Sequence, residues 1–140
     1  MRSWKYSVSS ADEAPAAAPL LLLGTLEENL KKAAGLGYDA VEVHTRENTD
    51  IDMDRIRSVM EKNSMSISAV VTGRLNTEGG CDLISDRPYI TDACIKGMRR
   101  YIDMAAGFDT DLIIGWARGK VPAGGNREKY MHRLAENLKI

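Results

Sequence analysis

The chain has 140 residues, of which 44% are hydrophobic, with 19 basic and 20 acidic residues and a formal net charge of -1. This length and apolar content are sufficient for a hydrophobic core, so we expect a single domain over residues 1–140 rather than a disordered polar chain. The balanced charge lacks the basic surface with which nucleic-acid-binding proteins neutralise phosphates, so nucleic acid is not an expected partner.

The cysteines and the N-terminal region bear on the cellular compartment. Cys81 and Cys94 are too few for a disulfide scaffold and lack the Cys-x-x-Cys spacing of metal and redox sites, so we expect reduced thiols in a cytoplasmic protein. The apolar stretch 14–23 follows Arg2 and Lys5, but prolines interrupt it and no small-residue cleavage site follows it. It is also far shorter than the roughly 20 residues that cross a membrane. We therefore expect neither a signal peptide nor a membrane partner.

The first half of the chain predicts two strands around one helix. Aromatic and apolar residues alternate with polar residues over 4–9, which indicates a half-buried strand. Thr25 and Glu28 have the spacing of a capping box, so a helix is expected to begin at about Thr25. Gly37 provides a left-handed helix stop, and the run 39–45 then reads as the second strand.

The second half continues the alternation of helices and strands. Asp52 is a candidate N-cap for a helix that precedes a third strand over 66–72. After a long loop, Pro88 suits the first turn of a helix that ends at Gly107. The apolar run within 111–117 predicts the fourth strand, and a final helix is expected after it.

A strand therefore precedes a helix four times, which predicts an α/β fold with a parallel sheet and right-handed crossovers. A doubly wound sheet of flavodoxin type covers its central strands with helices on both faces, so these strands should be apolar on both faces. The strand 39–45 instead places Glu42 and His44 together on one face. A (β/α)8 barrel turns one face of each strand inward and gathers polar groups at the C-terminal end, and this architecture fits better.

Polar or aromatic residues also end the third and fourth strands. Thr72 and the following Arg74 end the third strand, and alternation places Trp116 and Arg118 on one face at the end of the fourth. Barrel enzymes build their active sites at these strand ends. The candidate substrate-binding residues are Glu42, His44, Thr72, Arg74, Trp116 and Arg118.

Four segments, GYDAVEVHT, ISAVVTGR, LIIGWARGK and RLAENLK, together resemble the xylose-isomerase-like TIM-barrel superfamily. This group contains sugar phosphate isomerases and epimerases, ketose 3-epimerases and endonuclease IV-type enzymes. Such a barrel has about 250 residues or more, so the resemblance implies four βα units that match only its N-terminal half.

The resemblance implies metal-assisted proton or hydride transfer next to a sugar carbonyl in the complete barrel, with Mn, Mg, Co or Zn as the divalent metal. The family's acidic and histidine metal ligands lie on strands five to eight, which have no counterpart here. No metal ligand or catalytic residue is therefore assigned, and the question whether this chain is itself an enzyme stays open.

In this setting the candidate residues suit a sugar or a sugar phosphate. Glu42 and His44 suit sugar hydroxyls, Trp116 suits a sugar ring, and Arg74 or Arg118 suits a phosphate or carboxylate. The structural alternatives are that Glu42 and His44 form a hydrogen-bonded layer over the core, that Trp116 belongs to the core, and that Arg118 is a solvated loop charge.

A half-barrel would expose two sheet edges and a concave face, so we expect a homo-oligomer or a missing C-terminal half. The last helix has no Gly or Pro stop, which agrees with a truncated form. One alternative is a flavodoxin-like, non-catalytic binding module. Another is a fragment of an endonuclease IV-type, metal-dependent nuclease, which would carry histidines where this chain has Thr72 and Trp116.

Overall fold

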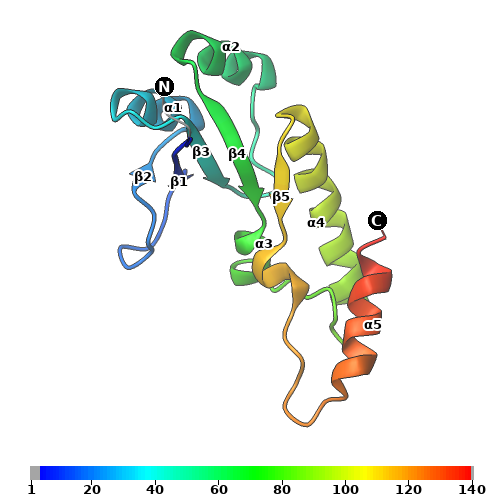
Figure 1. The fold of residues 1–140 in the computed structure, drawn as a ribbon. Helices are drawn as coiled ribbons and strands as arrows, with labels where there is room; N and C mark the ends of the chain where they lie inside the picture. Colours follow the sequence, from blue (N-terminus) through cyan, green and yellow to red (C-terminus); the bar gives the residue numbers. More distant parts are fainter. Residues whose placement is uncertain (1–3, 140) are drawn as a thin grey trace.

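The computed structural model describes residues 4–139 and has an α/β fold (Figure 1). Within these residues, five strands form one all-parallel sheet in the order β2-β1-β3-β4-β5. The strands are β1 (Ser7–Ala11), β2 (Leu22–Leu23), β3 (Ala40–His44), β4 (Ser66–Val71) and β5 (Asp111–Ile113). The helices are α1 (Leu26–Gly35), α2 (Met53–Asn63), α3 (Gly73–Thr77), α4 (Pro88–Gly107) and α5 (Arg127–Asn137), with a 3-10 helix over Gly115–Arg118.

Local sequence signals set the starts of the long helices. The capping box of α1 is confirmed, because the Glu28 amide donates to Thr25 Oγ1 at 3.2 Å and the Thr25 amide donates to Glu28 Oε2 at 3.0 Å. Asp52 accepts from the Arg55 amide at the start of α2. Pro88 opens α4, where its missing N–H leaves no helical hydrogen bond unmade.

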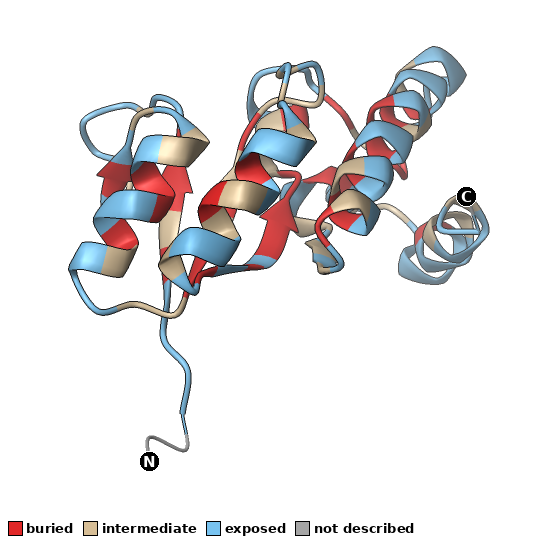
Figure 2. Cartoon of the chain, turned by 90° about the horizontal axis from the view of Figure 1, so that it is seen from above, coloured by how far each residue is buried: buried red, intermediate tan, exposed pale blue. Residues whose placement is uncertain are grey.

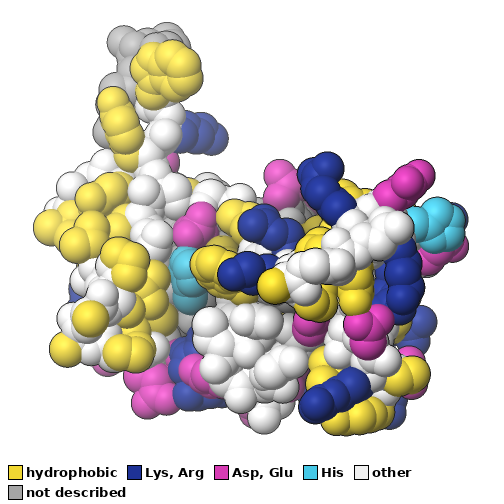
Figure 3. All heavy atoms as spheres, turned by 90° about the horizontal axis from the view of Figure 1, so that it is seen from below, with side chains coloured by type: hydrophobic (Ala, Val, Ile, Leu, Met, Phe, Trp, Pro, Cys, Tyr) yellow, Lys and Arg dark blue, Asp and Glu magenta, His cyan; other side chains and the backbone are white. Residues whose placement is uncertain are grey.

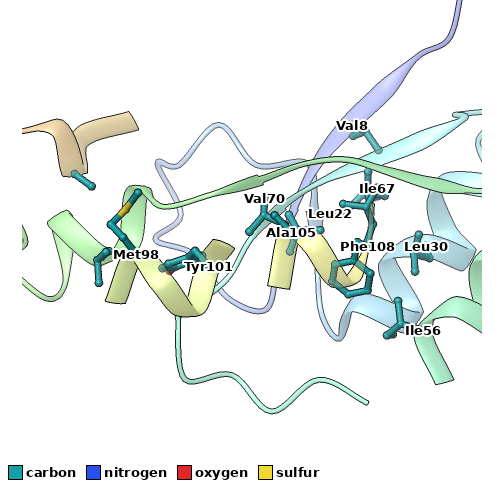
Figure 4. Close-up of a cluster of buried hydrophobic side chains, with 14 of the residues drawn as sticks. Val8, Leu22, Leu30, Ile56, Ile67, Val70, Met98, Tyr101, Ala105 and Phe108 are labelled. Atoms are coloured by element: carbon teal, nitrogen blue, oxygen red, sulfur yellow. The ribbon is translucent and has the colours of Figure 1, made fainter. Parts of the chain in front are cut away.

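One face of the sheet carries the hydrophobic core. Strand pairing aligns Val8, Val41 and Ile67 in one row and Val43 with Val70 in the next, and all five side chains are buried. Helices α1, α2 and α4 lie along this face (Figure 2). Their buried side chains close the core shown in Figure 4, among them Leu30, Ile56 and Tyr101, together with Phe108 directly after α4. Burying side chains of this size stabilises the fold by about 2 kcal/mol each.

The opposite face carries polar side chains together with small and aliphatic ones. The register across four strands forms two rows: Ser9, Glu42, Ala69 and Asp111, and then Ala11, His44, Val71 and Ile113. Glu42 and His44 are partly exposed on this face. The expected placement of these two side chains on one face of their strand is therefore confirmed.

The N-terminal strand differs from the prediction of 4–9. It begins at Ser7, which pairs with Ala40 at the start of β3, so Trp4 and Tyr6 precede the sheet and are exposed. The short strand β2 was not expected. Its two residues pair with the end of β1, and Leu22 is buried there.

The prediction of a strand over 111–117 is wrong beyond Ile113. Strand β5 has three residues, and Gly115 adopts a φ of 55° that starts the 3-10 helix. Alternation therefore stops before Trp116, and the expected common strand face of Trp116 and Arg118 does not form, because both lie on the 3-10 helix.

The expectation of reduced cysteines is also wrong in this structure. Cys81 and Cys94 form a disulfide with their Cα atoms 4.9 Å apart. The bond joins the loop after α3 to α4, two segments that the fold brings together although no spacing motif marks them. The cytoplasmic location stays a prediction.

The last helix, α5, packs beside the loop that precedes α4. Asn137 Nδ2 donates to the Leu83 carbonyl at 2.7 Å, Arg133 donates to the Ile84 and Ser85 carbonyls, and the Tyr130 hydroxyl donates to Asp86. In Figure 1 this helix stands beside the first turns of α4. None of the helices in the described part of the chain combines the length and apolar character needed to cross a membrane.

Candidate functional site

Glu42 and His44 form a hydrogen-bonded pair on the polar face of β3. His44 Nε2 lies 2.8 Å from Glu42 Oε1, and Ser9 Oγ of the neighbouring strand donates to the same oxygen at 3.2 Å. The side chains of His44 and Glu42 are 24% and 30% exposed. The pair is therefore ordered by the sheet and still open to solvent.

The carboxylate of Glu42 fixes the roles of the two imidazole nitrogens of His44. Because an ionised carboxylate only accepts hydrogen bonds, Nε2 carries the hydrogen that it shares with Glu42. Nδ1 of the neutral imidazole is then an acceptor, and it has no hydrogen-bond partner among residues 4–139. This nitrogen can accept a hydrogen bond from a ligand hydroxyl.

Two arginines at the same end of the sheet bind three carboxylates. Arg46 follows β3 and donates to Glu13 Oε1 at 2.6 Å and to Glu78 Oε2 at 2.7 Å. Arg74 in α3 donates to Glu78 Oε1 at 2.8 Å, and both arginines bind Asp12. Figure 3 views the molecule from this end and shows basic and acidic side chains side by side. The network ties together the segments that follow β1, β3 and β4.

The network shifts the pKa values of Glu78 and Arg46 in the directions that favour their charged forms. Burial alone would raise the pKa of Glu78, but hydrogen bonds from Arg74 and Arg46 outweigh burial and lower the pKa below its usual 4.5. The hydrogen bonds to Glu13 and Glu78 raise the pKa of Arg46. The two guanidinium groups therefore have local counter-charges, and Arg74 is 12% exposed.

Thr72 and the residues after β5 occupy different surroundings. Thr72 is fully buried, its hydroxyl donates to the Ile114 carbonyl and its amide donates to the Ile113 carbonyl at 3.1 Å. These bonds join the end of β4 to the end of β5. Trp116 is 65% exposed, and Arg118 is exposed on the same 3-10 helix. The structure thus joins Glu42 with His44 and places Arg74 in the neighbouring charge network, but gives Thr72 a bonding role between strands.

A cavity of about 650 Å³ opens at the carboxyl ends of β1 and β3. Its walls include the ends of these strands and the first turns of α1 and α2, and His44 lines it together with Ser10 and Thr45. In α/β proteins, ligands bind in crevices outside the carboxyl ends of parallel strands. The cavity beside His44 is therefore the candidate ligand site.

Within residues 4–139, no three His, Cys, Asp or Glu side chains are arranged to hold a metal ion. The divalent metal that the resemblance implies for a complete barrel stays a prediction. Searches against protein-family models and against curated proteins find no match to this chain.

Several residues of this region were missed by reasoning from the sequence. Asp12, Glu13, Arg46 and Glu78 were not assigned to a site, although Asp12 follows β1 directly and Arg46 comes two residues after His44. Their positions just beyond the strand ends could have indicated that these residues belong to the site. The pairing of Glu78 with both arginines depends on α3, a helix in a region that the sequence predicts as loop.

Proposed function

We propose that this chain is the sugar-binding, N-terminal half of a sugar isomerase or epimerase of the (β/α)8 type, as a half-barrel or truncated form. The observation that carries the proposal is the Glu42–His44 pair on the polar sheet face, of which His44 also lines the cavity. Proton or hydride transfer next to a sugar carbonyl would belong to the complete barrel.

The sheet supports this proposal in two ways. Strands β1, β3, β4 and β5 lie side by side in chain order, as consecutive barrel strands do. Helices α1, α2 and α4 lie along one face (Figure 2), so the face with Glu42 and His44 is turned away from these helices, as the inner face of a barrel is.

The proposed role of the pair is to bind and orient a sugar hydroxyl. Glu42 holds Nε2 of His44, so Nδ1 can accept a hydrogen bond from the hydroxyl. The second carboxylate oxygen of Glu42 can accept from a neighbouring hydroxyl. These two adjacent acceptors, His44 Nδ1 and the second carboxylate oxygen of Glu42, suit a ligand with several neighbouring hydroxyl groups.

The test is a titration of isotope-labelled protein with D-fructose and D-glucose, followed by NMR. We expect the largest shift changes at residues 42–45 and a weak affinity, because these 140 residues would supply only half of the proposed enclosing barrel. The variant His44→Gln should lower the affinity at least several-fold.

His132→Gln is the matched control, because His132 is exposed on α5, away from the cavity-lining residues. It should bind both sugars like the unmodified protein. Shift changes scattered over the surface, or equal affinities of the two histidine variants, would contradict the proposal.

A flavodoxin-like binding module without catalytic chemistry is the second candidate. The complete order β2-β1-β3-β4-β5 matches the strand order of that fold. Against it, β2 has two residues, and β1 and β2 are connected without a helix. Such a module would bind its ligand at the strand ends equally well after His44→Gln.

A further inference from the structure

The charges of the cavity beside His44 are mostly negative. Two basic side chains, Lys31 and Arg55, line it, and both bind Glu27, with N–O distances of 2.7 and 2.6 Å. The carboxylates that line it are Asp12, Glu27, Glu28, Asp50 and Asp52. The cavity therefore has more negative than positive charge, and its cations already have a partner.

Asp50 is the carboxylate that is available to a ligand. Asp12 binds Arg46 and Arg74, and Asp52 accepts the Arg55 amide as the N-cap of α2. The side chain of Asp50 has no hydrogen bond or ion pair among residues 4–139. A cationic ligand can bind this carboxylate without breaking a protein contact.

Asn29 adds a buried acceptor to the cavity. It lines the cavity, is 1% exposed, and donates from Nδ2 to the carbonyls of Ala11 and Gly24 at 3.1 and 3.0 Å. These two bonds fix the orientation of the amide and leave Oδ1 without a partner among the described residues. A buried acceptor without a donor is costly, and a ligand N–H or O–H that displaces the covering atoms and reaches Oδ1 would relieve that cost.

The basic groups near the cavity do not favour a phosphate. Arg46 and Arg74 bind three carboxylates, and Lys31 and Arg55 share Glu27. A phosphate would have to displace one of these ion pairs and approach the carboxylates of the cavity. The negative phosphate and the negative carboxylates would repel each other.

We infer that the cavity selects a ligand with a protonated amino group, so that an amino sugar binds in preference to a neutral or phosphorylated sugar. An ammonium group carries three donors and a positive charge, which match free carboxylate and amide oxygens. The choice of a sugar as the carrier of this group rests on the proposed function. The preference for the amino group rests on the cavity alone.

The test compares D-glucosamine, D-glucose, D-glucose 6-phosphate and ethanolamine by isothermal titration calorimetry at low salt and slightly acidic pH. We expect D-glucosamine to bind about tenfold more tightly than D-glucose, and D-glucose 6-phosphate to bind most weakly. Added salt should reduce the advantage of D-glucosamine.

Asp50→Asn should lower the affinity for D-glucosamine about threefold to tenfold and leave that for D-glucose unchanged. Asp92→Asn makes the same charge change at an exposed position of α4 that does not line the cavity, and it should change neither affinity. Asn29→Ala should also weaken D-glucosamine binding, and if this variant does not fold, the Asp50→Asn comparison decides.

The outcomes separate the two proposals. Equal affinities for D-glucosamine and D-glucose, or tighter binding of the phosphate, overturn the amino-group inference and leave the sugar function standing. Binding of ethanolamine that depends on Asp50, without binding of any sugar, supports the inference and overturns the sugar function. Absence of binding by all four compounds overturns both.

Discussion

At the scale of single residues, a few buried polar groups tie distant segments together. Tyr101 is fully buried in α4, and its hydroxyl donates to the Thr45 carbonyl just after β3 at 2.6 Å. Burial raises the pKa of Tyr101, so the hydroxyl stays a donor at neutral pH. The position of the loop next to His44 therefore depends on a helix that lies far away in the sequence.

Replacing Tyr101 by Phe should destabilise the protein by about 1–2 kcal/mol, because the Thr45 carbonyl loses its donor while the ring stays in the core. Urea denaturation measures the change. Tyr38→Phe is the control, since the Tyr38 hydroxyl has no hydrogen bond among the described residues, and it should be close to neutral. Equal stability of both variants would show that the buried hydrogen bond contributes nothing.

The lowered pKa of Glu78 predicts a dependence of stability on pH. A carboxyl whose pKa is lower in the folded state stabilises the protein above its unfolded pKa, about 4.5, and this stabilisation is lost as the pH falls through the folded pKa. The free energy of unfolding should therefore decrease in this acidic range. Glu78→Gln should be less stable than the unmodified protein at pH 7, and the difference should shrink in acid.

At the scale of elements, close approaches of helices are controlled by small residues. Gly97 in α4 faces Leu75 of α3, and a Cβ atom at position 97 would lie 2.5 Å from Leu75 Cδ1. This approach lets α4 pack on the segment after β4, and therefore helps to place α3 with Arg74.

Gly97→Ala should destabilise the protein by about 1–3 kcal/mol because it overpacks this contact. Gly35→Ala at the end of α1 makes the same change where a Cβ meets nothing within 4 Å, and should be neutral or slightly stabilising. Thermal unfolding of the two variants tests the contrast. A Gly97→Ala variant as stable as Gly35→Ala would mean that Leu75 moves aside without cost.

The disulfide between Cys81 and Cys94 also holds two segments together, the loop after α3 and helix α4. The two cysteines are 13 residues apart, and closing a loop of this length stabilises a protein by about 3 kcal/mol. The double variant Cys81→Ala/Cys94→Ala should lose stability of this order relative to the oxidised protein. Under reducing conditions the variant and the unmodified protein should differ much less. A difference that does not depend on reductant would assign the loss to packing alone.

At the scale of the whole molecule, the sheet has short edge strands, β2 and β5. Hydrophobic side chains are exposed near the N-terminal edge, including Trp4 and Leu21, and Figure 3 shows hydrophobic side chains gathered on that side. Ile113 at the β5 edge is also exposed. Such edges and patches favour association with another chain.

The half-barrel proposal therefore predicts self-association that increases with protein concentration, measurable by sedimentation velocity. Ile113→Lys places a charge on the β5 edge and should shift the equilibrium toward the monomer. Lys substitution of the exposed Leu36, at the end of α1, is the control and should leave the association unchanged. A monomer at all concentrations would contradict this part of the proposal.

Much of the fold could be predicted from local patterns. The starts of α1, α2 and α4 depend on Thr25, Asp52 and Pro88, whose capping chemistry acts within one helical turn. The shared face of Glu42 and His44 follows from the alternation of a strand. The end of β5 could not be predicted from alternation, because Gly115 turns the chain with a φ of 55° and Thr72, which lies in another unit, donates to the Ile114 carbonyl.

The sequence by itself therefore determined the α/β character, the helix starts and the pairing of Glu42 and His44 on one strand face, since these depend on neighbours within a few residues. Only the tertiary structure decided the strand order, the disulfide, the arginine and carboxylate network, and the cavity beside His44. Each of these joins groups that are far apart along the chain, so their contact is set by packing and strand register, which no local pattern records.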